Sequence, residues 1–453
     1  MKMSKEEAFA SGPILKTMLM MGIPTFIAQL VNLLYNIVDR IYIGHIEGSG
    51  AAALTGVGVC FPIITLVVAF ANLIGAGGAP LAGIALGEKK RERAERILGN
   101  SVTLLIIFAV FLTLLFQVIK KPFLFMFGAS EATYVYAGEY LAIYLCGTVF
   151  VMFSAGLNAY ITVQGQSVTA MCSVLIGAVM NMILDPVFIF AFQMGVRGAA
   201  VATILAQASS AIWILCFLFS KKATLKIKFS NMKPDMEIIA RIFSLGISPF
   251  IMGATESLIS VIFNSGAQRY GNDLYVGSIT ILQSVMQMVC TPLNGFTAGV
   301  QPIISYNYGA KNFDRVKKTC LSLIAITFTF SAVLSAITMM MPGFIAGLFT
   351  TDVSLIALCE EVMPVFICGL LVFGVQCGSQ SSFMALGKAK QSLFFALFRK
   401  VILLTPLALI LPATMHSVMG IYYAEPISDT ISAISCFLVF LWTLKKIMKG
   451  DKA

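Results

Sequence analysis

The feature that most constrains this chain is a series of twelve long apolar stretches separated by short polar loops. A helix needs about 20 apolar residues to cross a bilayer, and no loop between the stretches is long enough for a soluble domain. Apolar residues make up 58% of the sequence and charged residues 11%, whereas soluble proteins average about 45–50% and 25%. Lipid must therefore be the solvent for most of the chain, and the predicted fold class is all-α integral membrane.

The loops between these stretches alternate in their content of lysine and arginine. The expected spans lie near 14–38, 52–78, 97–119, 136–158, 165–192, 198–220, 239–265, 274–300, 318–342, 355–380, 394–415 and 419–444. Of the 31 basic residues, 26 fall in one set of loops: the N-terminus, 86–96, 221–241, 311–318, 388–400 and the C-terminus. The positive-inside rule then predicts an even number of spans with both termini in the cytoplasm.

The net charge of +10 is explained by this topology, so we do not expect nucleic acid as a partner. The N-terminal segment lacks the apolar core and cleavage site of a signal peptide, so the first span is expected to be retained. Ten scattered cysteines without a CxxC pair and only two histidines indicate neither a disulfide framework nor a zinc site. No resident cofactor is expected.

A shift of 222 residues brings the two halves of the chain into register. Six glycines and one proline match in this frame: Gly77, Pro80, Gly87, Gly147, Gly156, Gly165 and Gly198 with Gly299, Pro302, Gly309, Gly369, Gly378, Gly387 and Gly420. The pattern predicts two six-helix lobes, 1–220 and 238–453, joined by a basic linker at 221–237. Six spans per half make the repeats parallel, related by a pseudo-twofold axis along the membrane normal. Transporters with such repeats bind substrate between the halves and rock one half against the other.

Polar residues inside the first span form a stripe. Steps of three and four residues place them on one helical face, and they are Gln29, Asn32, Tyr35, Asn36 and Asp39. An acidic side chain near the bilayer centre costs about 2.5–3.5 kcal/mol on insertion scales, so Asp39 is a candidate functional residue. The alternative is that Asp39 pairs with Arg40 at the outer surface.

The fifth span carries a second acid. Asn181 and Asp185 are four residues apart, Pro186 follows directly, and Thr203 in the sixth span is expected at a similar depth. Proline removes a backbone donor and bends the helix, which frees carbonyl oxygens near the acid. Together with Asp39, these oxygen ligands suit Na⁺, whereas an acid in a dry cavity suits H⁺ because desolvation raises its pKa. The residues leave the choice between the two ions open.

The second half lacks this acid pair. The residue aligned with Asp39 is Asn264, and the residue aligned with Asp185 is Thr405. A structural role in a symmetric scaffold would predict a symmetric pair, so the asymmetry favours an ion site confined to the first half.

The second half has acids of its own. Glu256 shares a helix face with Ser260, and we expect both near the substrate cavity, where Glu256 would attract a cationic substrate or carry a second proton. The alternative is a carboxylate hydrogen-bonded between helices. In the last span we expect Glu425 near the outer surface and Asp429 deeper, as a weaker candidate.

Three segments resemble multidrug and toxic compound extrusion (MATE) transporters: MGIPTFIAQLVNLLYNIVDRIYIG, PLAGIALGEKK and NMILDPVFIF. The resemblance covers essentially the whole chain. It implies two six-helix bundles in a V around a central cavity, and export of cationic or amphipathic compounds in exchange for Na⁺ or H⁺. It also implies a cation-coupling site at Asp39, Asn181, Asp185 and Thr203, which would be the Na⁺ ligands, with Asn158 joining them. Some members of the family carry a coupling acid at the position of Glu256. Other members carry an acid in the tenth span instead, and this chain has no acidic residue within 362–386.

We therefore expect an antiporter that exports organic cations or amphipathic drugs across the plasma membrane in exchange for H⁺ or Na⁺, acting as a monomer. One alternative is a flippase for lipid-linked precursors, which would need a cavity rich in basic residues. Arg399 and Lys400 are the nearest examples. A second alternative is a non-transporting receptor or scaffold. An enzyme is not expected, because the sequence shows no nucleophile–base pair, metal-ligand cluster or phosphate loop.

Overall fold

The computed structural model of the protein describes residues 9–46, 50–127, 129–350 and 352–449, and the regular elements within them are helices. Those of the first half are α2 (Ile14–Gly44), α3 (Gly50–Gly87), α4 (Arg91–Met126), α5 (Glu131–Cys146), α6 (Thr148–Thr162), α7 (Ser167–Pro186), the π-helical turn η1 (Val187–Ala191) and α8 (Val196–Phe219). The second half has α9 (Met236–Tyr270), α10 (Asp273–Gly309), α11 (Phe313–Met340), α12 (Pro342–Gly347), α13 (Val353–Ile367), α14 (Leu370–Ala385), α15 (Ala389–Leu397), the π-helical η3 (Phe398–Leu404), α16 (Thr405–Met415) and α17 (Met419–Met448).

The number of spans agrees with the sequence. Ten helices of the described chain are long and apolar enough to cross a membrane, or twelve when each of two bent pairs counts as one span. The bent pairs are α5 with α6, at 60°, and α13 with α14, at 42°. Gly147 lies at the first bend and Gly369 at the second, and the two glycines are partners in the 222-residue repeat. The duplication therefore extends to the breaks within the helices.

Several helices run further than the apolar stretches that predicted them. The expected spans 52–78 and 274–300 become helices of 38 and 37 residues, α3 and α10. Their extra turns lie at the Gly-rich ends, where the two helices cross each other. Hydropathy registers the lipid-facing part of a helix, so it does not detect turns that are stabilised by contact with another helix.

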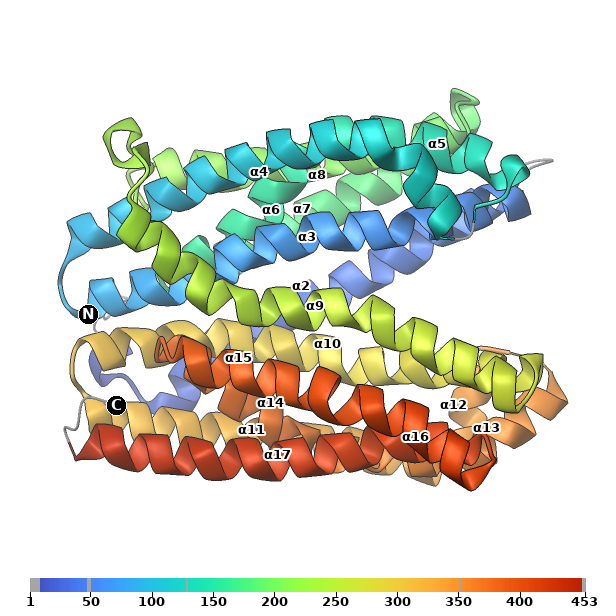
Figure 1. Ribbon diagram of the computed structural model, residues 1–453. Coiled ribbons are helices and arrows are strands. Elements are labelled where there is room, and N and C mark those ends of the chain that lie inside the picture. The colour runs from blue at the N-terminus through green and yellow to red at the C-terminus, as the bar shows by residue number, and fades with distance from the viewer. Residues whose placement is uncertain (1–8, 47–49, 128, 351, 450–453) are drawn as a thin grey trace.

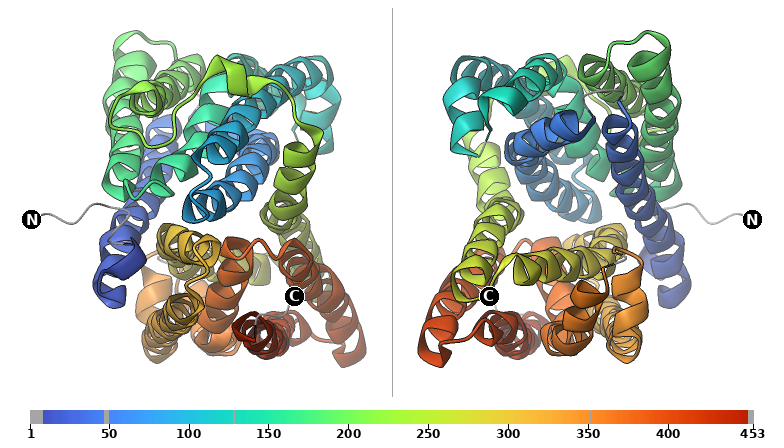
Figure 2. Two further views of the ribbon diagram at one scale, coloured as in Figure 1. Left: turned by 90° about the vertical axis from the view of Figure 1, so that its left-hand side faces the viewer. Right: turned by 90° about the vertical axis from the view of Figure 1, so that its right-hand side faces the viewer.

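The helices form two lobes that lie close together at one end of the molecule and separate toward the other (Figure 1). The first helix of each half crosses to the other lobe. Helix α2 packs against α10 as well as α7, and α9 packs against α3 as well as α15. Viewed along the molecule, α2 and α9 connect the lobes on opposite sides (Figure 2). Met18 and Met21 of α2 accordingly belong to a buried cluster with Val300 and Ile303 of α10.

Glycines permit the close approach at the narrow end. A Cβ at Gly87 would overlap the backbone carbonyl of Tyr306, and a Cβ at Gly309 would overlap that of Ile84. Tyr306 and Ile84 are 222 residues apart, as are Gly309 and Gly87, so the repeat relates the two contacts to each other. Because a side chain of any size would separate α3 from α10 here, these two repeat glycines allow the lobes to close.

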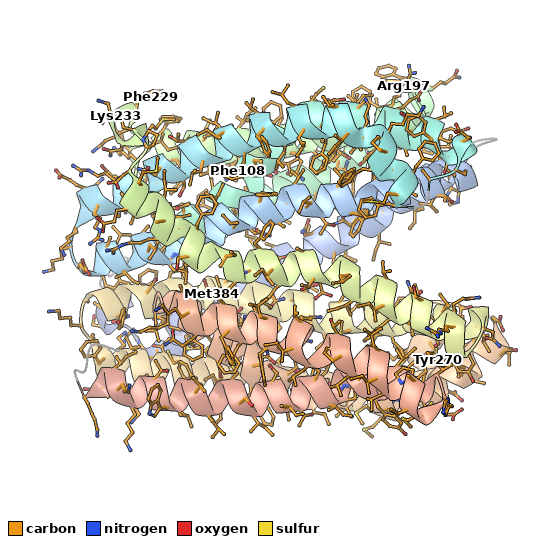
Figure 3. The ribbon with its side chains drawn as sticks, in the orientation of Figure 1. Phe108, Arg197, Phe229, Lys233, Tyr270 and Met384 are labelled. Carbon is orange, nitrogen blue, oxygen red and sulfur yellow. The ribbon has the colours of Figure 1, made fainter. Side chains whose placement is uncertain are left out.

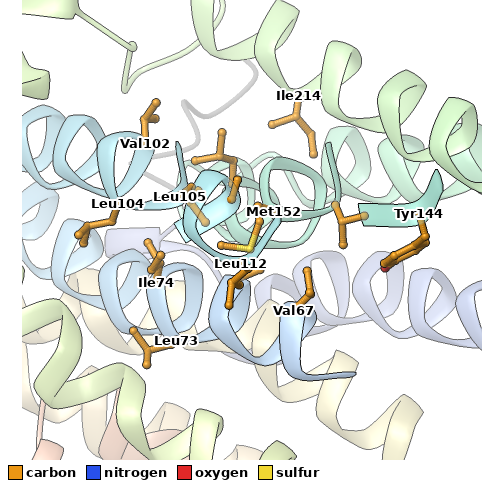
Figure 4. Close-up of a cluster of buried hydrophobic side chains, with 14 of the residues drawn as sticks. Val67, Leu73, Ile74, Val102, Leu104, Leu105, Leu112, Tyr144, Met152 and Ile214 are labelled. Atoms are coloured by element: carbon orange, nitrogen blue, oxygen red, sulfur yellow. The ribbon is translucent and has the colours of Figure 1, made fainter. Parts of the chain in front are cut away.

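Each lobe has its own apolar core. In the first lobe, Leu105 and Leu112 of α4 point toward Met152 of α6 and Ile214 of α8 (Figure 4). In the second lobe the buried cluster includes Phe263, Phe366 and Tyr422. Large side chains from several helices thus fix each bundle, and the crossing helices α2 and α9 add residues to the clusters of the other lobe.

The linker between the lobes is bound to the first lobe. The Asp235 amide donates to Asn100 Oδ1 at 2.7 Å, and Thr103 Oγ1 donates to the Met232 carbonyl at 2.7 Å. Lys228 forms an ion pair with the buried Glu95 at 2.5 Å. Helix α9 begins at Met236, two residues before the predicted boundary of the second lobe.

The basic linker and both ends of the chain lie on the same side of the molecule. Helix α2 begins and α17 ends at the narrow end (Figure 1). Lys233 of the linker lies at that end, whereas Arg197 and Tyr270 lie on separate lobes at the open end (Figure 3). This arrangement agrees with an even number of spans.

Candidate functional site

A polar cavity of about 500 Å³ lies in the first lobe and is closed on one side by α10. Among its lining residues are Gln29, Asn32 and Tyr35 of α2, which are three of the polar stripe residues predicted from the sequence. Gln301 and Ser305 of α10 face it from the second lobe. The lining therefore joins both halves of the chain. The fourth stripe residue, Asn36, is exposed, and its side chain donates to the Asn32 carbonyl at 2.6 Å.

The two acids of the first lobe lie next to each other and beside Asn181, which lines this cavity. Asp185 on α7 is fully buried and accepts a hydrogen bond from Asn181 Nδ2 at 3.2 Å. Asp39 on α2 approaches Asp185 closely enough for a hydrogen bond between the side chains. No described lysine or arginine forms an ion pair with Asp185. The acids therefore form a close pair, whereas the alternative Asp39–Arg40 pair involves a side chain that is not described. The Arg40 side chain lies outside the described part of the structure.

The local chain geometry positions this pair. Pro186 directly follows Asp185 and ends the regular part of α7, and the chain continues as the π-helical η1. Proline cannot donate to the preceding turn, and π-helical turns commonly occur at functional sites. The sequence had predicted the interruption, and the structure shows it as a change in helix type.

Two residues around the acids were not identified from the sequence. Tyr140 of α5 is buried near Thr203 and Asp39. Gln207 lines the cavity together with Tyr35 and accepts from Ser154 Oγ at 2.5 Å. Gln207 is one helical turn beyond Thr203, so the spacing alone could have suggested it. Tyr140 belongs to no polar stripe, and only the packing of α5 brings it to the site.

Asn158 lies at a different level of the same cavity. Its amide donates to the Ala170 carbonyl at 3.0 Å and to Ser173 Oγ at 2.5 Å. Ser173 precedes Asn181 by eight residues, which is about 12 Å along a helix. Asn158 therefore lines the cavity but contacts α7 away from the acids, whereas Asn181 lines the cavity and also binds Asp185. Thr203 is a further residue of the lining.

The predicted substrate residues Glu256 and Ser260 lie in the second lobe, apart from this cavity. Ser260 Oγ donates to Gln283 Oε1 at 3.3 Å. Glu256 forms an ion pair with Lys400 at 3.1 Å, and its side chain is 54% exposed. The residues expected to form one substrate surface are thus divided between the two lobes.

A buried charged cluster in the second lobe corrects two predictions. Arg399 and Lys400 had been counted in the cytoplasmic loop 388–400, but they lie in η3 within the span, only 4% and 2% exposed. Glu425 had been expected near the outer surface, but it is 1% exposed. The physical reason is that these acidic and basic side chains neutralise each other inside the lobe, whereas a hydropathy profile scores each residue alone and does not detect such pairs. Arg399 binds Glu425 at 3.1 Å and Asp429 at 2.6 Å. The remaining 24 basic residues of that loop set still preserve the alternation.

Twelve spans in two repeated lobes, with acids and amides around an internal cavity, define a membrane transporter. The family model described as MatE matches residues 24–187 and 249–410, which together are more than two thirds of the chain. The two matched segments begin 225 residues apart, in agreement with the internal repeat. The chain belongs to the MatE family, the multidrug and toxic compound extrusion transporters.

Curated relatives and solved structures agree with this assignment. The chain is 26% identical over 450 residues to "Multidrug export protein MepA" of Staphylococcus haemolyticus, covering 98% of this chain and 97% of the relative. It is 24% identical to MepA of Staphylococcus aureus strain NCTC 8325, covering 95% and 94%.

The fold matches a MATE crystal structure in the bent conformation with a TM-score of 0.92, at 24% identity over the full length of both chains. It matches an outward-facing multidrug resistance MATE transporter with a TM-score of 0.91, at 23% identity, covering 99% of this chain and 100% of the other. At this identity the likeness defines the fold.

Proposed function

We propose that this protein is a secondary active antiporter that exports organic cations or amphipathic drugs across the plasma membrane in exchange for H⁺ or Na⁺. The observation that carries the proposal is the close pair of Asp39 and Asp185 beside a polar cavity. Two carboxylates within hydrogen-bonding range repel each other when both are ionised, so such a pair favours a shared proton or a bound cation. The pair is therefore suited to take up and release a coupling ion.

The surrounding ligands suit both candidate ions. Asn181, Thr203 and Tyr140 add oxygen atoms to the two carboxylates, and oxygen ligands are those preferred by hard cations. Asp185 is fully buried, and burial favours protonation of a carboxylate. The ion would be transported cargo. It couples to export if ion and substrate bind preferentially to different conformations of the lobes.

The cavity and the relatives support a drug-like substrate. The cavity of about 500 Å³ combines apolar walls with amide and hydroxyl groups, which is the usual character of a small-molecule site. The MepA relatives are described as multidrug export proteins. We further propose that the protein acts as a monomer. We also propose that both termini lie in the cytoplasm, because the basic loops lie at the end of the molecule that carries the termini.

The flippase alternative loses its main support in the structure. It requires basic residues available to bind phosphates. The two basic residues buried in the second lobe, Arg399 and Lys400, are both engaged by acids. Three carboxylates face these two cations, so the cluster would not attract a strongly anionic lipid headgroup.

Transport in proteoliposomes under separately imposed Na⁺ and pH gradients tests the proposal. We expect one gradient to drive export of a cationic dye by the wild type, and Asp39→Asn or Asp185→Asn to abolish that coupling. Glu139→Gln is the matched control, because it neutralises an acid on the same lobe that forms a surface pair with Arg197. Export at the wild-type rate by both aspartate variants, at equal reconstitution, would contradict the mechanism.

A further inference from the structure

The buried cluster of the second lobe contains more acids than bases. Arg399 and Lys400 face Glu256, Glu425 and Asp429, so the fully ionised cluster has a net charge of −1. Arg399 stacks over the Phe373 ring at 4.4 Å and binds Glu425 and Asp429, which fixes its guanidinium. Lys400 has a single ion-pair partner among the described residues, Glu256 at 3.1 Å.

Only one acid of this cluster is accessible. The side chains of Lys400, Glu425 and Asp429 are at most 2% exposed, whereas that of Glu256 is 54% exposed. A Cβ at Gly253, three residues earlier on α9, would contact Ala69 of α3 across the lobe boundary. Glu256 is less than one helical turn further along α9, so its exposed side chain lies next to this contact between the lobes. Helix α9 runs from there toward the end where the lobes separate (Figure 1). A solute between the lobes can reach Glu256.

A second carboxylate of the cluster, that of Glu425, lies beside the helical turn that carries Lys400, because Arg399, the residue before Lys400 in η3, binds it at 3.1 Å. Arg399 occupies Glu425 Oε1, and the other oxygen, Oε2, has no hydrogen-bond partner among the described residues. Lys400 Nζ likewise has no hydrogen-bond partner among the described residues, although it forms the ion pair with Glu256. A lysine has a flexible four-carbon stem, which lets its ammonium change partners by rotation of the side chain.

We propose that Glu256 is a binding site for the cationic group of a monovalent organic cation, and that Lys400 occupies this site as a tethered competitor in the absence of the substrate. When a cation binds Glu256, Lys400 moves to the free oxygen of Glu425. The added charge neutralises the cluster, so a single positive charge is accommodated. Anions are excluded by the three acids. The inference rests on the proposed export of organic cations and assigns the selection by charge to the second lobe.

The competition makes a specific prediction about affinity. A competitor tethered by a short flexible chain has an effective concentration of roughly millimolar order. Replacing Lys400 with methionine removes the competitor and retains most of the stem volume. We expect Lys400→Met to bind tetraphenylphosphonium, a permanent cation, about tenfold more tightly than the wild type. Glu256→Gln should bind it about tenfold more weakly, and the double variant should resemble Glu256→Gln.

Equilibrium binding of tetraphenylphosphonium to the purified full-length protein in detergent, without any gradient, measures these changes. Lys400→Arg provides a second variant in case Lys400→Met does not fold, because it keeps the buried charge. A guanidinium can bind Glu256 with two hydrogen bonds, so we expect about threefold weaker binding of the probe. Unchanged or weaker binding by folded Lys400→Met, or tighter binding by Lys400→Arg, would overturn the inference.

The same measurements separate this inference from the proposed antiport. If the affinities change as expected but neither gradient drives dye export, the antiport mechanism fails and the Glu256 site stands. If a gradient drives export through Asp39 and Asp185 but Lys400→Met does not bind the probe more tightly, only the inference about Lys400 fails.

Discussion

The two lobes share one backbone plan but compensate their buried acids in opposite ways. In the first lobe, Asp185 lies against another carboxylate, that of Asp39, and an amide. In the second lobe, Arg399 and Lys400 neutralise most of the charge of three acids. An acid pair of the first kind favours an ion taken up from solution, whereas the second cluster supplies its own cations. The duplicated frame therefore places an acid pair in one lobe and a mixed cluster of two bases and three acids in the other.

The largest expected effect comes from removing the fixed cation of the second lobe. Arg399→Met leaves Glu425 and Asp429 buried without their partner, which typically costs about 3–5 kcal/mol. We expect a large loss of thermal stability or of folded protein. Arg197→Ala, which breaks an exposed pair with Glu139, is the control and should change the melting temperature little. Equal stability of both variants would show that the cluster is not needed for the fold.

Neutralising an acid of the first lobe should have the opposite structural effect. Asp185→Asn removes a repulsion and keeps the shape of the side chain, so we expect unchanged or higher thermal stability. Ion-driven export should fall by about tenfold to a hundredfold, which corresponds to coupling free energies of about 1–3 kcal/mol. Measuring melting and dye export on the same preparation tests both parts. A stability loss as large as that of Arg399→Met would remove the contrast between the lobes.

The glycine contact at the narrow end tests whether the lobes are equivalent as a frame. Gly87→Ala and Gly309→Ala each place a methyl group against a backbone carbonyl of the other lobe, and overpacking of this kind costs about 1–3 kcal/mol. We expect both variants to shift the population toward lobes separated at this end, by similar amounts. Distances between spin labels on Lys311 and Lys89 would report the shift. Gly347→Ala, which meets open space, is the control, and a shift in only one of the two variants would indicate an asymmetric gate.

The smallest effects are expected at the anchors of the two crossing helices. Asn100 accepts from the Asp235 amide just before α9, and Asn307 Nδ2 donates to the Phe9 carbonyl at 3.0 Å just before α2. Asn100→Ala and Asn307→Ala should each destabilise the protein by about 1 kcal/mol, the usual net value of a hydrogen bond. Thermal melts of the single and double variants measure this. A double variant that differs from the sum would show that the two crossings are coupled.

The sequence by itself determined the frame. Apolar length defined the twelve spans, basic loops placed both ends of the chain on one side, and the glycines at a 222-residue shift defined two lobes. It also identified Asp39 and Asp185 as unusual, because an acid in lipid is costly wherever the helix is placed. These properties follow from solvent and local geometry, which act on each segment separately.

Only the tertiary structure decided which charges meet. Arg399 and Lys400 were attributed to a loop because a basic residue alone in a span is unfavourable, and their partners on α9 and α17 are distant in sequence. Tyr140 and Asp39 are also brought together by packing. The energy of a buried charge depends on the atoms around it more than on its own helix. Helix rotation and the crossing of α2 and α9 between lobes therefore determined the two sites.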